Sequence, residues 1–404
     1  MTGATIKRDL RTGRPLWADS PGLGVPVRPL TAAISVDVAI VGAGISGAFM
    51  AHELSKDHSV AVLDRRAPLT GSTLASTALL QWEIDLPLTA LAKKIGAANA
   101  KRAYLKSRQA VDALKQIVAD ERIVCGLNDK SSLYLAGDAY GHRALEAEAE
   151  ARAEIGLDSR YLDAAALRER FGLDRTGAIF SSGSASGDPA RLAAGLLRRA
   201  QARGAKVCSP VEVLRAVSDP DGVTLLTDAE HAVRAKSVVF CSGYEFPKGV
   251  PTPGAEVIST WAMASKPRQR CPAWLRDMLV WEASDPYLYL RMGGDGRLVV
   301  GGEDEASAVA HQDKAKLTRK CEAIAAKLKR LLPDIEFEID YGWAGAFGES
   351  VTGLPSIGPV EGMDHIWAVM GFGGNGITYS VIASQVVAAE VRGDRDPDAD
   401  LYRS

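Results

Sequence analysis

The segment VDVAIVGAGISGAFMAHELSKDHSVAVLDRR, from Val36 to Arg66, decides the fold class of this chain. Its start, Val36 to Val41, is an apolar run that predicts a buried strand. We expect a helix from about Ile45 to Ser55 and a second strand from Ser59 to Leu63. A strand, a glycine-rich loop, a helix and a strand in this order predict the first unit of an α/β dinucleotide-binding domain.

The loop of this segment carries Gly42, Gly44 and Gly47 in the pattern G-x-G-x-x-G. The first glycine permits a tight turn, the second lets a pyrophosphate approach the backbone, and the third lets the helix pack closely on the strand. The helix N-terminus offers N–H groups and a positive dipole end to the phosphates. Asp64 ends the second strand and is expected to accept hydrogen bonds from ribose hydroxyls. The motif itself fits NAD(P) and FAD alike.

Composition limits the classes of partner. The chain has 404 residues, of which 47% are hydrophobic, and a formal net charge of −2, so we expect a large core and no nucleic-acid partner. One basic stretch, Ser265 to Arg276, is interpreted as a solvated loop. The sequence has no stretch long enough for a membrane span and no hydrophobic signal core. We therefore expect a cytoplasmic protein without a membrane span.

The cysteines and histidines predict neither a disulfide framework nor a metal site. The five cysteines include no C-x-x-C pair, and their odd number fits a reducing compartment. HELSKDH, from His52 to His58, superficially resembles a zinc-binding helix, but residues six positions apart do not share a helical face. We expect no metal site.

Two further segments have unusual compositions. GSTLASTALLQWEID, from Gly71 to Asp85, is rich in small and hydroxyl-bearing residues. Its hydroxyls can bond a polar ligand, or Ser72 or Thr73 can cap a helix, and both interpretations can hold together. MGFGGNGITYS, from Met370 to Ser380, places a glycine loop between a strand-like run and a helix-like run. Such a loop either brings backbone close to a ligand or is a tight turn.

With its later motifs, the sequence resembles the glycine oxidase/D-amino-acid oxidase superfamily of FAD flavoproteins, which includes sarcosine and γ-glutamylputrescine oxidases. The resemblance runs from about Val36 to Val391. Beyond the first glycine loop, the matching motifs follow in the order of that family: the segment from Gly71 to Gln81, the helix DPARLAAGLLRRAQARGAKV from Asp188 to Val207, SPVEVL with Val211, SVVFCSGYE with Ser242 and Gly243, Trp343-Ala-Gly345, TGLPSIGP and GFGGNGI.

The resemblance implies an α/β fold with a Rossmann-like FAD-binding domain and a second, mixed-sheet α+β substrate domain. The FAD-binding domain is expected to consist of residues 1–85, 186–262 and 340–404, and the substrate domain of residues 86–185 and 263–339. The residue patterns are compatible with this division. They predict helices at Ala97–Val118, Arg143–Ile155 and His311–Pro333, and strands in DMLVWEA, YLYLRM and RLVVGG.

FAD is the implied cofactor. The first loop is expected to hold the pyrophosphate, and the last loop to lie against the flavin ring, where the helix starting at about Ile377 stabilises the negative charge of reduced flavin. Binding is expected to be non-covalent, because no cysteine follows Cys321 and GSTLAST contains no histidine. The implied FAD-binding residues are Gly42, Gly44, Ile45, Ser46, Gly47, Asp64, Arg65, Ser72, Thr73, Ser76, Thr77, Leu79, Val211, Ser242, Gly243, Gly345, Gly373, Gly374, Asn375, Gly376, Ile377 and Thr378.

The implied reaction is oxidation of the C–N bond of a small amine or amino acid by hydride transfer to flavin, with dioxygen or a carrier as electron acceptor. Sarcosine-type enzymes of the family have a lysine where Thr378 stands, which disfavours N-methylglycine as the substrate. Two alternatives remain: an NAD(P)-linked dehydrogenase and a non-catalytic flavin-binding subunit.

Three residues are candidates for the catalytic site: Arg291, Tyr289 and Lys266. In YLYLRMGGDGR, Tyr287, Tyr289 and Arg291 alternate and so share one face of a strand. Arg291 either pairs with a substrate carboxylate or bonds an internal group. Lys266 stands roughly where some oxidases of the family place a lysine that promotes reaction with dioxygen; the alternative is an ordinary surface lysine.

Overall fold

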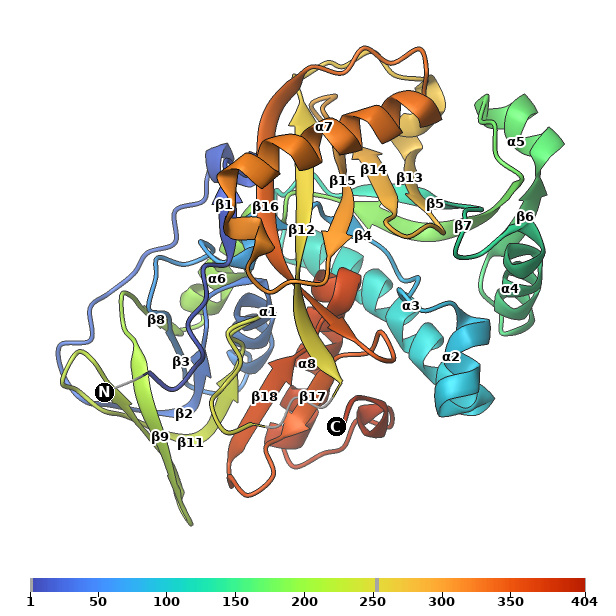
Figure 1. Cartoon of the computed structure of the whole chain (residues 1–404). Helices are drawn as coiled ribbons and strands as arrows, with labels where there is room; N and C mark the ends of the chain where they lie inside the picture. The colour runs from blue at the N-terminus through green and yellow to red at the C-terminus, as the bar shows by residue number, and fades with distance from the viewer. Residues whose placement is uncertain (1–2, 251–253, 404) are drawn as a thin grey trace.

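The computed structural model of the chain describes residues 3–250 and 254–403. In these ranges the strands form two sheets, one of ten strands and one of eight. Figure 1 shows the larger sheet in the upper half of the view and the smaller sheet below it. No helix in the described ranges is long and apolar enough to cross a membrane.

The eight-stranded sheet has the order β17-β18-β11-β2-β3-β8, with β10 and β9 added beside β11. Its central pairs, from β18 to β8, are parallel. Parallel strands are buried on both faces, which explains the nearly continuous apolar runs in their sequences. The strands are β2 (Ile34–Val41), β3 (Val60–Leu63), β8 (Lys206–Cys208), β9 (Val213–Asp219), β10 (Gly222–Thr227), β11 (Val233–Phe240), β17 (Ser356–Pro359) and β18 (Ile366–Met370).

Four helices pack with this sheet around one core. They are α1 (Ile45–Leu54), α3 (Ala97–Asp120), α6 (Pro189–Ala202) and α8 (Gly376–Val391). The helices α1 and α8 are apolar nearly all round because they are buried on most sides. The predicted strand, loop, helix and strand between Val36 and Leu63 are confirmed by β2, α1 and β3.

The ten-stranded sheet has the order β1-β16-β12-β15-β14-β13-β5-β7-β4, with β6 paired to β7. It is mixed, since β13 pairs parallel to β5 and the other pairs are antiparallel. The strands are β1 (Arg11–Gly13), β4 (Leu79–Leu80), β5 (Asn128–Leu135), β6 (Ser159–Asp163), β7 (Gly177–Ser186), β12 (Ala255–Ser265), β13 (Met278–Glu282), β14 (Leu288–Met292), β15 (Leu298–Glu305) and β16 (Ile339–Ser350).

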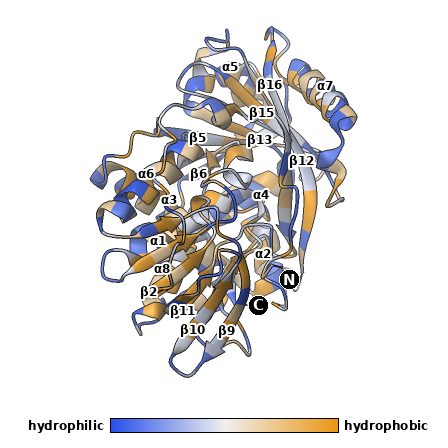
Figure 2. Cartoon of the chain, turned by 90° about the vertical axis from the view of Figure 1, so that its left-hand side faces the viewer, coloured by the Kyte–Doolittle hydropathy of each residue, from blue (hydrophilic) through white to orange (hydrophobic). Residues whose placement is uncertain are grey.

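One amphipathic helix, α7 (Lys314–Leu331), covers a face of the ten-stranded sheet (Figure 1). Ile324 and Leu328 of α7 pack with Leu290 and Val300 of the sheet in one hydrophobic cluster. Hydrophobic and hydrophilic residues both appear along α7 in Figure 2, as its predicted amphipathic character requires. The helix ends before Pro333, which cannot continue it.

The other α-helices of the described ranges are α2 (Leu88–Ile95), α4 (His142–Glu154) and α5 (Ala164–Phe171), and α2 packs on α3 and α4. A buried carboxylate joins two of them and also forms an ion pair within α4. Glu148 on α4 accepts hydrogen bonds from the Leu88 N–H at 2.7 Å and from Arg152 Nε at 2.7 Å. The carboxylate thereby occupies the positive N-terminal end of α2 and fixes α2 against α4.

This architecture is the predicted fold class: α/β, with a Rossmann-like layer and a mixed-sheet layer. The domain boundaries remain a prediction. β12 and β16 both belong to the ten-stranded sheet, although most of each strand falls in the predicted FAD-binding ranges. Residues 1, 2, 251–253 and 404 of the predicted ranges lie outside the described residues.

Candidate active site

A cavity of about 460 Å³ is lined by residues from both sheets. At one end it meets Gly42, Asp64 and Cys241, which directly follow β2, β3 and β11. Ligands of open α/β sheets bind outside the carboxyl ends of such strands. The cavity is therefore the candidate site.

The first glycine loop can adopt its conformation only with glycines. Gly42 has φ +114°, and a Cβ on it would lie 2.4 Å from the Cys241 carbonyl oxygen. A Cβ on Gly47 would lie 1.8 Å from the Gly42 carbonyl oxygen. Gly44 faces the cavity, where a Cβ would meet only Thr73 Oγ1, at 3.2 Å. Gly42 and Gly47 thus shape the turn, and Gly44 leaves room for a ligand beside the backbone.

Asp64 holds this loop from the end of β3. Its Oδ2 accepts a hydrogen bond from the Ala43 N–H at 2.7 Å, and its Oδ1 accepts one from the Arg66 N–H at 2.8 Å. Burial raises the pKa of the Asp64 carboxyl. Each carboxylate oxygen has a further lone pair, so Asp64 can also accept a hydroxyl from the cavity side.

The basic residues at this end are already paired. Glu245 is 4% exposed and accepts hydrogen bonds from Arg65, from Arg66 Nη1 at 2.9 Å and Nη2 at 2.6 Å, and from the Arg8 N–H at 3.0 Å. This buried network fixes the chain after β3 against the chain after β11.

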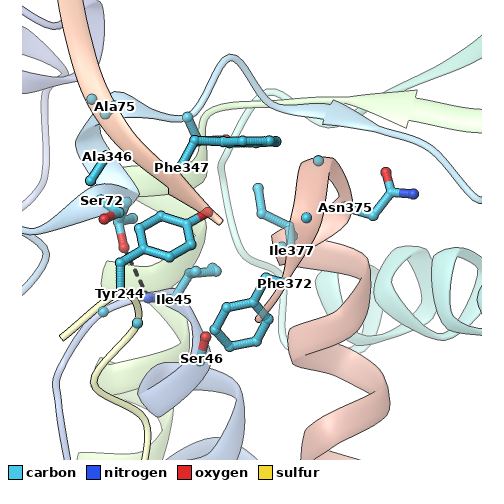
Figure 3. Close-up of a pocket in the computed structure, with 18 of the residues that line it drawn as sticks. Ile45, Ser46, Ser72, Ala75, Tyr244, Ala346, Phe347, Phe372, Asn375 and Ile377 are labelled. Atoms are coloured by element: carbon cyan, nitrogen blue, oxygen red, sulfur yellow. Dashed lines mark hydrogen bonds between the residues drawn. The ribbon is translucent and has the colours of Figure 1, made fainter. Parts of the chain in front are cut away.

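The hydroxyl-rich segment forms a short 3₁₀ helix, η2 (Ser72–Ala75), beside the first loop. Thr73 Oγ1 accepts a hydrogen bond from the Ile45 N–H at 3.0 Å, the contact drawn dashed in Figure 3. Ser72 Oγ lines the cavity, and it is buried without a hydrogen-bond partner among the described residues. Neither hydroxyl caps η2 itself. An orphaned hydroxyl at this position leaves a donor and acceptor for a ligand.

The last glycine loop begins α8 and is tied to the chain just after β4. Asn375 Nδ2 donates to the Glu83 carbonyl oxygen, and Thr378 Oγ1 donates to the Gln81 carbonyl oxygen at 2.8 Å. The Gly374 N–H donates to Asp85 Oδ2 at 2.7 Å. These three bonds fix the loop, including its 3₁₀ turn η5 (Gly373–Asn375), at the cavity wall.

The two glycine loops face the same cavity from neighbouring helices. Ile45 and Ser46 of α1, Phe372 just before η5 and Ile377 at the start of α8 all line it, and the Phe372 ring lies beside Ser46 (Figure 3). The hydroxyls of Ser46 and Ser380 lie 2.8 Å apart and join α1 to α8. The packing of α1 against α8 therefore brings together in space two loops that are far apart in the sequence.

These features fit an FAD molecule. The glycine cradle and the α1 N-terminus suit a pyrophosphate, Asp64 suits a ribose, and the orphaned Ser72 hydroxyl suits a polar edge of the cofactor. The last loop and α8 suit a flavin ring, which gains negative charge on reduction. In the described ranges no group of three or more His, Cys, Asp or Glu side chains is arranged to hold a metal ion.

The far end of the cavity is aromatic and acidic. Tyr134 and Trp281 are stacked with ring centroids 3.7 Å apart, and Tyr287 and Tyr289 lie 5.6 Å apart. Burial raises the pKa of Tyr287 well above its ordinary value, so this phenol stays protonated. The acidic residues at this end are Glu83, Asp85, Glu282 and Glu349, with Asp304 behind Tyr287.

Most of the sequence-predicted cofactor residues meet in this cavity. Gly47 is the exception, since it supports the turn from behind. The residues that line the cavity are Gly42, Gly44, Ile45, Ser46, Asp64, Arg65, Ser72, Thr73, Ser76, Thr77, Leu79, Val211, Ser242, Gly243, Gly345, Gly373, Gly374, Asn375, Gly376, Ile377 and Thr378.

The three predicted catalytic residues lie in different places. Tyr289 lines the cavity. Arg291 does not: it is 1% exposed and donates to the Thr77 carbonyl oxygen at 2.7 Å and the Gly187 carbonyl oxygen at 3.0 Å. Lys266 is exposed and pairs with Glu338 at 2.5 Å, away from the lining residues. The contacts therefore favour the structural alternative for Arg291 and the surface alternative for Lys266.

Sequence reasoning missed several residues of the far end, including Asp85, Tyr134, Trp281, Asp304 and Glu349. Asp85 is the last residue of the hydroxyl-rich segment, and an acidic residue beside a ligand-binding loop could have been chosen as a candidate from the sequence. The others come from separate strands, and no local spacing links them. Only the tertiary structure brings them together.

The sequence matches the family model described as "DAO: FAD dependent oxidoreductase" over residues 37–390. It is 26% identical to the glycine oxidase of Geobacillus kaustophilus (strain HTA426), covering 87% of this chain and 92% of that protein. It is 24% identical to the γ-glutamylputrescine oxidoreductase of Escherichia coli (strain K12), covering 94% and 89%. The crystal structure of glycine oxidase from Geobacillus kaustophilus matches with a TM-score of 0.76 at 22% identity, over 90% of this chain and 96% of that chain.

Proposed function

The chain belongs to the DAO family of FAD-dependent oxidoreductases, and on this premise we propose that it oxidises the C–N single bond of a small amine or amino acid. The observation that carries the proposal is the shared cavity. The two glycine loops that suit FAD and the aromatic, acidic end that suits an amine line one continuous space. A substrate in the aromatic end would therefore meet the flavin ring directly.

The reaction converts an H–C–N–H unit into a C=N bond. Two electrons and one proton leave the carbon, and a second proton leaves the nitrogen. When bound, FAD accepts the two electrons and the proton from the carbon, that is, a hydride. The nitrogen must give up its ammonium proton first, and a carboxylate in the cavity is a suitable acceptor.

The chain's own residues bind, orient and exclude water. Tyr289 and Tyr287 stay protonated, because burial raises the pKa of both phenols. Tyr289 can donate a hydrogen bond to the substrate, while the Tyr287 hydroxyl is donated to Asp304. Phe347 and Phe372 give the middle of the cavity apolar walls (Figure 3). The α8 N-terminus favours negative charge where reduced flavin develops it.

FAD binding is proposed to be non-covalent, and the electron acceptor to be dioxygen or a carrier. The proposal places the protein in a reducing compartment such as the cytoplasm, which its five free cysteines support. Acid precipitation of the purified holoprotein should leave the yellow colour in the supernatant. Colour in the pellet would contradict non-covalent binding.

The decisive experiment is an absorbance spectrum followed by an anaerobic screen of amines and amino acids. We expect a flavin spectrum that bleaches with at least one amine and returns in air or with an artificial acceptor. A flavin spectrum that no amine bleaches would favour a non-catalytic flavin-binding subunit. A colourless protein that reduces NAD(P) with the substrate would favour the dehydrogenase alternative.

A further inference from the structure

The carboxylates at the far end of the cavity differ in whether they already have partners. Glu282 pairs with Arg175 at 2.7 Å, and Glu83 accepts a hydrogen bond from the Ser132 hydroxyl. Asp85, Asp304 and Glu349 have no salt bridge among the described residues. Of these, Asp85 and Glu349 line the cavity and remain available to a ligand, whereas Asp304 lies behind Tyr287, outside the lining.

Asp304 does not line the cavity and lies behind Tyr287. Its Oδ2 accepts a hydrogen bond from the Tyr287 hydroxyl at 2.9 Å, while its Oδ1 is buried without a hydrogen-bond partner among the described residues. A buried carboxylate oxygen without a donor is costly, because it has lost water and gained no replacement. Because Asp304 lies behind the lining, a protonated amine in the cavity would act on it through its opposite charge and not through a direct hydrogen bond.

The three carboxylates also interact with one another. Burial, followed by the negative charges of Asp304 and Asp85, raises the pKa of the Glu349 carboxyl. The Asp85 side chain is accessible from the cavity, but protein surrounds it on its other sides. This desolvation raises the pKa of Asp85 to about 6. A cation placed among these groups would relieve their repulsion.

The aromatic walls are a second, independent feature that favours a cation. The stacked pair Tyr134–Trp281 and the tilted pair Tyr287–Tyr289 both line the cavity. Ring faces attract ammonium groups through their quadrupoles, and sets of aromatic rings are a common means of binding alkylammonium ligands.

No positive charge at this end is available for a carboxylate ligand. Among the cavity-lining residues, the arginines are Arg65 and Arg66, both paired with Glu245 at the opposite end, and there is no lysine. Arg291 donates to two backbone carbonyls. A substrate carboxylate would therefore enter a region of uncompensated negative charge.

We propose that the substrate carries a second, protonated amino group and no carboxylate, and that Asp85 and Glu349, which line the cavity, bind this group while the other amine is oxidised. This inference rests on the proposed oxidation of an amine. It names the substrate class as a diamine and excludes α-amino acids as preferred substrates. Tyr287 positions Asp304 through its hydroxyl.

The test compares three probes of equal chain length on the FAD-loaded protein: 1,4-diaminobutane, butylamine and 4-aminobutanoate. Anaerobic flavin reduction gives half-saturating concentrations, and calorimetry gives affinities without turnover. We expect the diamine to bind at least about thirty-fold more tightly than butylamine, and the amino acid more weakly than butylamine. Glu349→Gln should weaken diamine binding at least about tenfold and leave butylamine binding unchanged.

A matched control is Glu361→Gln, which removes a negative charge from an exposed site outside the cavity and should leave the preference for the diamine intact. Equal binding of all three probes, or tighter binding of 4-aminobutanoate, overturns the inference while amine oxidation stands. Absence of flavin reduction by any probe, together with tight diamine binding, contradicts the proposed function and supports the binding site. A diamine that does not bind overturns the inference.

Discussion

The two ends of the cavity differ in how completely their charged side chains are paired. At the end near the first glycine loop, Glu245 holds two arginines, and both oxygens of Asp64 accept backbone N–H groups. At the far end, Glu349 has no salt bridge among the described residues, and Asp85 accepts only one backbone N–H. Charges that are fully paired hold the protein in shape, whereas charges left unpaired are available to a ligand. Neutralising a carboxylate should therefore reduce stability at the first end and affect substrate binding at the second.

The largest effect is expected from Gly47→Val at the paired end. A Cβ at this position would lie 1.8 Å from the Gly42 carbonyl oxygen, so the loop and α1 must move apart. We expect the free energy of unfolding to fall by more than about 4 kcal/mol and FAD occupancy to be lost. Chemical denaturation and flavin content of the purified protein measure the two effects.

Gly24→Ala is the matched control, because a Cβ there meets nothing within 4 Å. Normal flavin content in Gly47→Val would mean that this loop does not shape the cofactor site.

Next in size is Glu245→Gln, which leaves Arg65 and Arg66 without their shared carboxylate. We expect the free energy of unfolding to fall by about 2–4 kcal/mol, somewhat below the cost for a fully enclosed pair because Arg66 is partly exposed. Glu349→Gln should instead retain the stability of the wild type, because Glu349 has no salt bridge among the described residues, and removing its charge relieves its repulsion with Asp304 and Asp85. Urea melts of both variants sharpen the comparison. Equal losses of stability would remove the distinction between the two ends.

Arg291→Met tests the role of Arg291. The sequence suggested that this residue binds the substrate, but in the structure it lies outside the cavity lining. Two backbone carbonyls, of Thr77 and Gly187, would lose a charged donor in a buried site. We expect a loss of about 2–3 kcal/mol in the free energy of unfolding and little change in the half-saturating concentration of substrate. Unchanged stability with strongly weakened binding of a carboxylate-bearing amine would restore the catalytic alternative.

The pH dependence is the smallest expected effect. The pKa of Asp85 is raised from 3.8 to about 6, so the folded protein holds this proton more tightly than the unfolded chain does. The negative charge of Asp85 opposes folding above pH 6, and this cost is relieved as the pH falls from about 6 towards 3.8. Diamine binding should show the opposite trend and weaken by about tenfold per pH unit below 6, because protonation removes the binding charge.

Asp85→Asn removes the Asp85 carboxyl, so any pH dependence that remains must come from the substrate or from another group. The pH profile of diamine binding should become flat near pH 6 in the variant. A variant with the wild-type profile would assign the titration to another group.

The parts of the site that the sequence predicted are local. The spacing of Gly42, Gly44 and Gly47 and the order of strand, loop, helix and strand are fixed by backbone sterics within about thirty residues. The last loop was recognised from its glycines and its resemblance to a family pattern. These segments require no knowledge of distant contacts.

The parts that the sequence did not predict depend on partners from other elements. Tyr287 and Tyr289, which alternate with Arg291, line the cavity, but Arg291 reaches the N-terminal segment, where its guanidinium lies over the Trp17 ring at 5.3 Å. That segment precedes the first predicted strand and carried no motif. Likewise, the acidic character of the far end arises from β15, β16 and the chain after β4, which only the tertiary structure assembles.

The bonds between the last loop and residues 81–85 have a consequence for biosynthesis. The wall of the cavity at Gln81, Glu83 and Asp85 leaves the ribosome long before Gly374, Asn375 and Thr378 are made. β18, a neighbour of the central strand β11, also comes from this late part of the chain. A nascent chain that lacks these residues has the pyrophosphate loop but half of a cofactor site. FAD capture is therefore expected only after nearly the entire chain has been translated, which makes flavin content a direct report of complete, correctly assembled protein.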